Sequence, residues 1–328
     1  IVVTFQLNSP SQVEFPSSRN HRPYPANDPA GQAAVMTVQE HEDAPEEIIP
    51  RDQWSFARLE SGQAVPDASH VYLVTGFQPG KVYQVIYTTT GAPIVGLGQL
   101  ATRDMAGFLR YGTSEEGNPL AGTVDHAYSF GVSQSGRFLR LFLYLGLNWD
   151  EKGRQVFDGF IPHVAGGKMG EFNHRFAQPS SQASRSPNSL FPYSDADQTD
   201  PETGRTDGLM HSMVAKGKVP KVMYVNTPAE YWGGHGSLLH TDLAGARDLD
   251  LMDSVRIYMV SGAQHANGSL PLTDFDPSDS IRTQQLFNCL DYRAVLRAAL
   301  INLDRWARAE REAPPSRYPR LSDGTAVT

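Results

Sequence analysis

The stretch Ala127–Arg140, AYSFGVSQSGRFLR, decides the fold of this chain. It begins with residues typical of β-strands, passes through a cluster of glycine and serine, and continues into an apolar run that predicts a helix over about 136–147. A strand that turns sharply into a helix exposes the residue at the turn and holds its backbone in a strained conformation. Ser133 occupies that position. The pattern therefore predicts an elbow that presents a serine hydroxyl.

The spacing of small residues indicates which serine stands at the turn. In such an elbow the residues two before and two after the turn must be small, because strand and helix nearly touch there. Around Ser133 these residues are Gly131 and Ser135, so the pattern is Gly-x-Ser-x-Ser-Gly instead of a strict Gly-x-Ser-x-Gly. If Ser135 stood at the turn, the bulky Arg137 would fill the second position. We favour Ser133; the alternative is a Ser/Gly-rich connection with no catalytic role.

The composition narrows the class of protein. The chain has 328 residues, of which 40% are hydrophobic and 20% charged, as in ordinary globular domains. A net charge of −8 argues against nucleic acid or an anionic membrane as a partner. No apolar run approaches the roughly 20 residues of a transmembrane helix. The single cysteine, Cys289, excludes an intrachain disulfide and a metal site built from cysteines.

Strand and helix signals alternate along much of the chain. The elbow strand, over about 125–130, is followed by its helix and by a strand within 156–165. Strand, helix and strand in this order form a βαβ unit, which implies a parallel sheet. Further signals predict a helix over 99–110, strands over 220–227 and 255–261, and a closing helix over about 283–312. We therefore expect an α/β fold, with a mostly parallel sheet flanked by helices.

Two segments depart from this alternation. Residues 1–70 have few helix signals, and strands over 2–7 and 34–39 predict a β-rich N-terminal extension packed on the core. We assign residues 71–328, which start with strands over 70–75 and 81–87, to the α/β domain. Residues of about 168–215 show little periodicity, which is typical of a functional loop or lid. We interpret this segment as a lid-like insertion.

Acidic residues cluster over 195–207 and raise the question of calcium. An EF-hand loop needs glycine at its sixth position and glutamate at its twelfth; counted from Asp195, these are Asp200 and Thr206. The sequence therefore excludes an EF-hand, and it leaves a looser calcium site open.

Three residues that follow predicted strands suggest a common site. In an open α/β sheet, catalytic groups lie in loops after the carboxyl ends of strands. Such loops contribute Ser133, Glu230 and His265, in that order. Serine, acid and histidine in this order are typical of the α/β-hydrolase scaffold.

Each of these residues has a chemical role in acyl transfer. A serine hydroxyl is a weak nucleophile and must give its proton to a base, which would be His265. Glu230 would fix the tautomer of His265 and stabilise the imidazolium. The oxyanion of the tetrahedral intermediate needs fixed N–H donors, and the backbone N–H of Gln134 would be one. For the second donor, the loops 76–78 and 88–91 both remain candidates.

Competing assignments exist for the acid and for a metal. Asp242 and Asp248 also follow the strand over 220–227, but both lie well beyond its end. Four other histidines could suggest a metal site; they are His163, His174, His235 and His240. No two of them have the His-x-x-x-His spacing of a helical zinc motif. We expect no metal and no cofactor.

Several sequence blocks resemble those of a bacterial α/β-hydrolase-domain family, largely uncharacterised and assigned to serine esterases. The resemblance covers roughly 34–312 and rests on Phe77–Gly80, Val95–Gly98 with Arg103 and Asp104, Gly131–Arg140, Phe172–Pro179, Thr199–Gly204, Ala229–Trp232, Leu239–Asp242 and Gly262–His265. It implies the α/β-hydrolase fold, with Ser133 as nucleophile, His265 as base and Glu230 as acid. Members of the family often look longer at the N-terminus and exported, which implies a secreted or periplasmic location.

The sequence thus predicts a serine carboxylic-ester hydrolase that acts on a small-molecule ester through an acyl-enzyme. The alternatives within enzymes are hydrolysis of amides or lactones and acyl transfer to an alcohol. The alternative outside enzymes is a catalytically silent α/β-hydrolase fold that serves as a binding module. The oligomeric state stays open.

Overall fold

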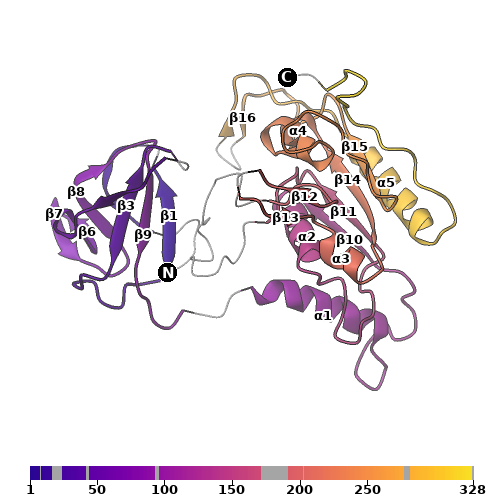
Figure 1. Cartoon of the computed structure of the whole chain (residues 1–328), viewed down its shortest axis with the longest axis horizontal. Coiled ribbons are helices and arrows are strands. Elements are labelled where there is room, and N and C mark those ends of the chain that lie inside the picture. Colours follow the sequence, from indigo (N-terminus) through magenta and orange to yellow (C-terminus); the bar gives the residue numbers. More distant parts are fainter. Residues whose placement is uncertain are drawn as a thin grey trace. The chain divides into compact units, whose positions relative to one another are not determined.

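The chain forms two compact units, which are drawn in Figure 1. The computed structural model describes residues 1–7, 9–16, 24–41, 44–92, 96–170, 191–201, 203–276 and 281–326. The first unit contains Ile1–Leu97, and the second contains Gly98–Gly170 and Leu190–Thr328. Among the described residues, none of the helices has the length and apolar character needed to cross a membrane.

The first unit is built from antiparallel strands. Its main sheet has the order β1-β9-β3-β4, a second sheet has the order β2-β8-β5, and β6 and β7 form a hairpin. The elements are β1 (Val2–Gln6), β2 (Ser11–Glu14), β3 (Val35–Gln39), β4 (Glu47–Ile49), the 3-10 helix η1 (Arg51–Gln53), β5 (Trp54–Ser55), β6 (Ala57–Glu60), β7 (Gln63–Pro66), β8 (Val71–Phe77) and β9 (Val82–Ile86).

A core of its own holds the first unit together. Aromatic rings meet edge to face in it, as Phe77 and Tyr83 do with centroids 4.9 Å apart. The unit extends beyond residue 70, the predicted end of the N-terminal extension, because β8 and β9 pair with β1, β2 and β3. The sequence of alternating strands therefore closes a separate core before the first long helix begins.

The second unit contains the predicted parallel sheet, in the order β10-β11-β14-β15. β10 and β11 pair residue for residue, so that Val132 lies beside His163 at their carboxyl ends. The elements are α1 (Leu97–Tyr111), β10 (Tyr128–Val132), α2 (Gln134–Tyr144), β11 (Gly159–His163), β12 (Gln198–Thr199), β13 (Thr206–Asp207), α3 (His211–Ala215), β14 (Lys221–Asn226), α4 (Pro228–Gly233), η3 (Gly236–Leu239), β15 (Val255–Met259), β16 (Phe275–Asp276), β17 (Ile281–Arg282) and α5 (Arg293–Ala307). The predicted βαβ unit is confirmed.

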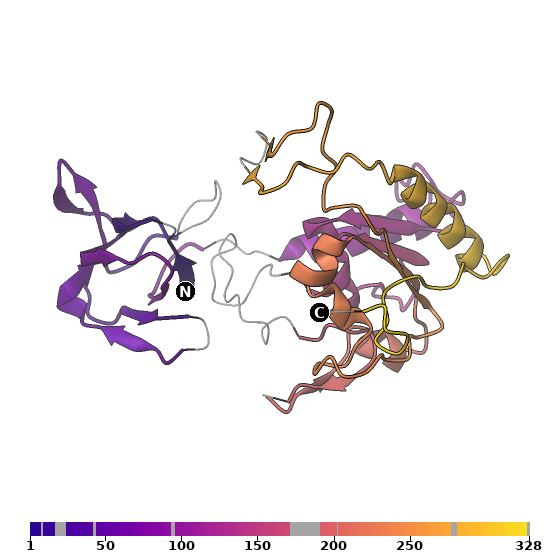
Figure 2. The same ribbon diagram turned by 90° about the horizontal axis from the view of Figure 1, so that it is seen from above.

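The central strand β14 is buried on both faces of the sheet, because successive side chains of a strand point to opposite sides. In β14, Val222 and Tyr224 pack with helix α2 on one face, whereas Met223 and Val225 pack with helix α5 on the other. Figures 1 and 2 show α5, in gold, alongside this sheet. The sheet is thus the middle layer of three, and the carboxyl ends of its strands lie along one edge.

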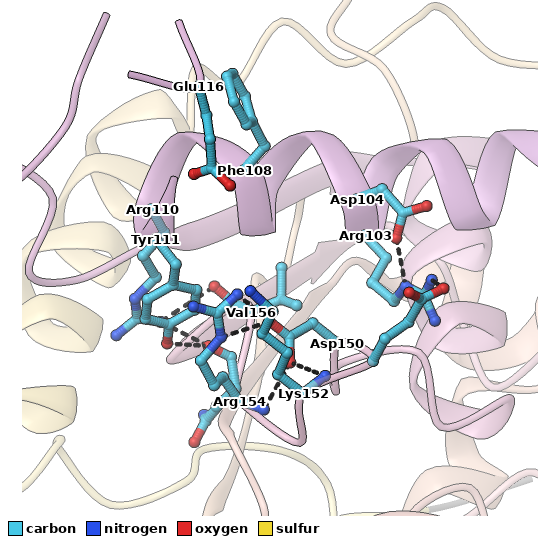
Figure 3. Close-up of polar contacts among 12 residues, drawn as sticks. Arg103, Asp104, Phe108, Arg110, Tyr111, Glu116, Asp150, Lys152, Arg154 and Val156 are labelled. Atoms are coloured by element: carbon cyan, nitrogen blue, oxygen red, sulfur yellow. Dashed lines mark hydrogen bonds and ion pairs between the residues drawn. The ribbon is translucent and has the colours of Figure 1, made fainter. Parts of the chain in front are cut away.

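Helix α1 is fixed at its C-terminal end to the loop that leads into β11. Arg110 pairs with Asp158 at 2.9 Å, and the hydroxyl of Tyr111 donates to the carbonyl of Gln155 at 2.5 Å. The guanidinium of Arg154 lies 4.2 Å from the centre of the Tyr111 ring. Figure 3 shows the side chains of Arg110, Tyr111 and Arg154 gathered below the helix. The contacts tie the first helix of the second unit to its sheet.

The closing helix is shorter than predicted. The apolar spacing predicts it over about 283–312, but α5 spans Arg293–Ala307. Leu286 and Leu290, which extended the apolar pattern, are exposed, and Asn288 forms hydrogen bonds with the loop 262–268 instead of a helical ladder. Apolar spacing alone could not reveal this competing set of bonds.

The described part of the predicted lid belongs to the second unit. Residues 171–190 lie outside the described residues. After them, Phe191 and Tyr193 pack against Leu238 and Leu243, and residues 209–213 contribute to the core beside α2. This part of the insertion is therefore anchored by buried contacts.

We predict that Leu303→Ala destabilises the second unit by about 2–5 kcal/mol, because it removes a buried side chain and leaves a cavity. Leu303 is fully buried, and it lies so close to Gly159 that a β-carbon there would come within 2.8 Å of it. Leu300→Ala is the matched control on the same helix: this leucine is 46% exposed, and we expect a change within about 0.5 kcal/mol. Urea denaturation measures both, and equal effects would contradict the packing described here.

Candidate active site

Ser133 lies at the turn between β10 and α2. Its φ of 55° and ψ of −115° fall where residues other than glycine are rare. Strand and helix approach closely: a β-carbon on Gly131 would lie 2.4 Å from the carbonyl oxygen of Ser135. The N–H of Ser133 donates to the carbonyl of His163 at 2.8 Å. The predicted elbow is therefore present, and the neighbouring strand fixes its apex.

Glu230 lies in the first turn of α4, directly after β14. Pro228 occupies the first helical position, which suits a residue without an N–H. One oxygen of Glu230, Oε2, accepts from the N–H of Thr227 at 2.9 Å and from its hydroxyl at 2.5 Å. The carboxylate thus faces back over the helix end, and its other oxygen is left for a further partner.

That partner is His265, in the loop between β15 and α5. Its Nδ1 lies 2.6 Å from Oε1 of Glu230, and its Nε2 lies 2.9 Å from Oγ of Ser133. With Nδ1–H donating to the carboxylate, Nε2 is free to accept the proton of the serine hydroxyl. The structure thus brings the three residues into one hydrogen-bonded chain.

The electrostatics keep Glu230 ionised. Burial acts to raise the pKa of Glu230, but the hydrogen bonds from His265 and Thr227 outweigh it, so the pKa lies below the ordinary value. A lowered pKa means that the carboxylate stabilises the fold above the pKa of the unfolded chain. This contribution is lost as the pH falls through the lower pKa of the folded state.

The comparison with protein families assigns the domain to which this site belongs. A family model described as "Alpha/beta hydrolase domain" matches residues 46–328. The chain belongs to this family. Comparisons with curated proteins and with solved structures gave no match. The resemblance seen in the sequence is confirmed, and the parallel sheet is that of an α/β-hydrolase domain.

The two other candidate acids of the hydrolase domain have different partners. Asp242 accepts from the N–H of Ala246 at 2.7 Å. Asp248 lies 3.4 Å from Nδ1 of His240 and accepts from the N–H groups of two residues of the C-terminal segment. Burial acts to raise the pKa of Asp248, but hydrogen bonds from this segment lower it to about 2. Neither aspartate is bonded to His265.

The described histidines that were considered as metal ligands have different partners; they are His163, His235 and His240. His163 bonds through Nδ1 to the carbonyl of Val225 at 2.9 Å, and His240 lies buried against Tyr231. His174 lies outside the described residues. Within the described part of the chain, no group of three His, Cys, Asp or Glu side chains could hold a metal ion.

The acidic segment 195–207 is engaged with the core. Asp195 is buried and accepts from the hydroxyl of Tyr224 at 2.6 Å, and burial raises the pKa of this carboxyl. The buried guanidinium of Arg140, on α2, donates to the carbonyls of Gly167 and Tyr193. These bonds connect the elbow helix, β14 and the described part of the insertion.

The candidate oxyanion donors lie in different units. The N–H of Gln134 is at the start of α2, where a helix has no carbonyl to bond it. The loops 76–78 and 88–91 both belong to the first unit, and the N–H of Gln78 donates to the hydroxyl of Tyr83 at 2.8 Å.

Two supporting residues were missed by sequence reasoning. Thr227 is the N-cap of α4, and the pattern Thr-x-x-Glu, from Thr227 to Glu230, was a usable signal. His163 contributes a backbone carbonyl, for which the sequence holds no signal.

We predict that Gly131→Ala disrupts the elbow, because its β-carbon would displace the carbonyl of Ser135. The expected loss of stability is about 1–3 kcal/mol, measured by thermal and urea denaturation. Gly98→Ala, in α1, is the control: a β-carbon there meets nothing within 4 Å, and we expect unchanged stability or a gain of up to about 1 kcal/mol. If Gly131→Ala were as stable as the control, strand and helix would not be in contact at the elbow.

Proposed function

We propose that the chain is a serine carboxylic-ester hydrolase that acts through Ser133, His265 and Glu230. The observation that carries the proposal is the chain of two hydrogen bonds, at 2.9 and 2.6 Å, that joins the three side chains. Access supports it as well: Ser133 is half-buried and the side chain of His265 is 48% exposed, so that a small molecule can approach both. Membership of the α/β-hydrolase family makes hydrolysis the expected reaction class.

In the first half of the reaction, Oγ of Ser133 attacks the carbonyl carbon of the ester while Nε2 of His265 takes the hydroxyl proton. The imidazolium is stabilised by the carboxylate of Glu230, which accepts from its Nδ1–H. The tetrahedral intermediate then collapses, the bond to the alcohol oxygen breaks, and His265 returns the proton to the departing alkoxide. An acyl-enzyme on Ser133 and a free alcohol result.

In the second half, water replaces the alcohol. His265 takes a proton from water as the water oxygen attacks the acyl carbon. The second tetrahedral intermediate then collapses, the bond between the acyl carbon and Oγ of Ser133 breaks, and His265 returns the proton to Oγ, which releases the carboxylic acid and restores Ser133. In both halves the N–H of Gln134 would donate to the oxyanion. Because this N–H lies at the N-terminus of α2, the helix dipole also favours the negative charge there.

The substrate is a small-molecule ester, and the insertion of about 168–215 would act as a lid that shapes its pocket. The net charge of −8 argues against nucleic acid as a partner, because its phosphates are also negative. We further propose that the enzyme needs neither a metal nor a cofactor, and that it acts in a secreted or periplasmic location.

Assays on panels of esters, amides and lactones, with and without an acceptor alcohol, separate ester hydrolysis from the related reactions. A non-catalytic binding module would form no fluorophosphonate adduct.

We predict that Ser133→Ala lowers hydrolysis of a chromogenic short-chain ester by about 10⁶-fold, to the background rate. Ser135→Ala is the matched control two residues away, and we expect it to retain activity because its hydroxyl is not bonded to His265. Circular dichroism confirms that both variants are folded. Activity in Ser133→Ala, or its loss in Ser135→Ala alone, would refute the assignment of the nucleophile.

We predict that Glu230→Gln lowers kcat by about 10²–10⁴-fold, because an amide cannot stabilise the imidazolium and favours the wrong tautomer. Asp242→Asn and Asp248→Asn make the same carboxylate-to-amide change at the two other candidate acids. Both should keep kcat near that of the wild type. A larger loss in either aspartate variant than in Glu230→Gln would transfer the role of the acid to that aspartate.

A further inference from the structure

The position of His265 needs support from outside its own loop. The loop has no regular secondary structure around this residue, and the side chain is 48% exposed. Its imidazole nevertheless has to stay within hydrogen-bond distance of Ser133 through two proton transfers, and a displacement of about 1 Å can cost a factor of 10² in rate. This inference rests on the proposed function and asks what holds the base in place.

Tyr292, the residue directly before α5, contacts this loop. Its hydroxyl donates to the carbonyl of His265 at 3.2 Å and lies 3.4 Å from the carbonyl of Gln264. The side chain is buried, with 7% of the residue exposed. Burial, together with the nearby charge of Glu230, raises the pKa of Tyr292, so its hydroxyl keeps the proton that it donates.

The ring of Tyr292 packs against His163. The two ring centres lie 5.5 Å apart at an interplanar angle of 65°. His163 is itself fixed, because its Nδ1 bonds to the carbonyl of Val225 at 2.9 Å. The backbone carbonyl of His163 accepts the N–H of Ser133 at 2.8 Å. One tyrosine therefore contacts both the residue that holds the nucleophile and the residue that serves as base.

We propose that Tyr292 is a positioning residue, which holds the backbone of His265 at a fixed distance from the end of β11, where His163 bonds the N–H of Ser133. The ring rests on His163, and the hydroxyl holds the loop through the carbonyl of His265. Asn288 forms a second connection to the loop. Its N–H donates to Oε1 of Gln264 at 2.9 Å, and the carbonyl of Asn288 accepts from the N–H of Gly268 at 2.8 Å. The non-helical segment 288–292 before α5 thus serves as a clamp on the loop 262–268, which carries His265 and is called the base loop below.

The test is Tyr292→Phe, which removes the hydroxyl and keeps the ring on His163. We predict that the rate constant for labelling of Ser133 by a fluorophosphonate falls about tenfold, and that kcat for a short-chain ester falls by a similar factor. KM stays unchanged, because His265 acts in both acylation and deacylation and both steps slow together. The endpoint of labelling stays at that of the wild type, because every molecule is still folded and competent.

Tyr258→Phe is the matched control. Its hydroxyl also donates to a backbone carbonyl, that of Pro314 at 2.7 Å, and it lies on β15 in the same unit. Tyr258→Phe removes the same type of hydrogen bond, from a tyrosine hydroxyl to a backbone carbonyl, but this bond does not join the base loop. We therefore expect the labelling rate of the wild type.

The outcomes separate the two proposals. A wild-type labelling rate in Tyr292→Phe overturns the positioning role. A lower endpoint with an unchanged rate constant for the labelled fraction also overturns it, because Tyr292 would then serve folding alone. If Ser133→Ala hydrolyses the ester at the wild-type rate, the proposed function fails, whatever Tyr292→Phe shows.

Discussion

The close approach of β10 and α2 is the constraint on which the site depends. The backbone of Ser135 leaves no room for a β-carbon on Gly131, and the turn places Ser133 at a φ of 55°. This backbone strain is tolerated because the apex is held on both sides, by the core beside α2 and by the carbonyl of His163. The backbone of Ser133 is therefore fixed, and the hydrogen bond with Nε2 of His265 orients its hydroxyl.

The parallel sheet brings the other two residues to that hydroxyl. Ser133, Glu230 and His265 follow β10, β14 and β15, whose carboxyl ends lie along one edge of the sheet. Glu230 accepts the N–H of Thr227, the N-cap of α4, and bonds His265 with its other oxygen, so a helix end orients the acid. The same carboxylate thus accepts the hydrogen bonds that cap α4 and the hydrogen bond from His265, which links the stability of α4 to the geometry of the site.

Much of this arrangement could be predicted from the sequence, because it depends on local signals. Glycine and serine spacing predicted the elbow, and the strand–helix–strand order predicted the parallel sheet that the structure contains. Residues placed directly after strands predicted which side chains meet. By contrast, the end of the first unit at Leu97 depends on pairing between distant strands, and the clamp formed by Asn288 and Tyr292 depends on contacts across loops. The apolar spacing instead predicted a helix that included these residues.

The central claim is that Ser133 carries the acyl group during turnover. The most direct measurement is to mix the protein with a chromogenic ester, stop the reaction with acid within milliseconds, and map the trapped acyl group by mass spectrometry of the peptides. We expect a burst of alcohol and an acyl group on Ser133. An acyl group on Ser135, or a burst with no acylated serine, would contradict it.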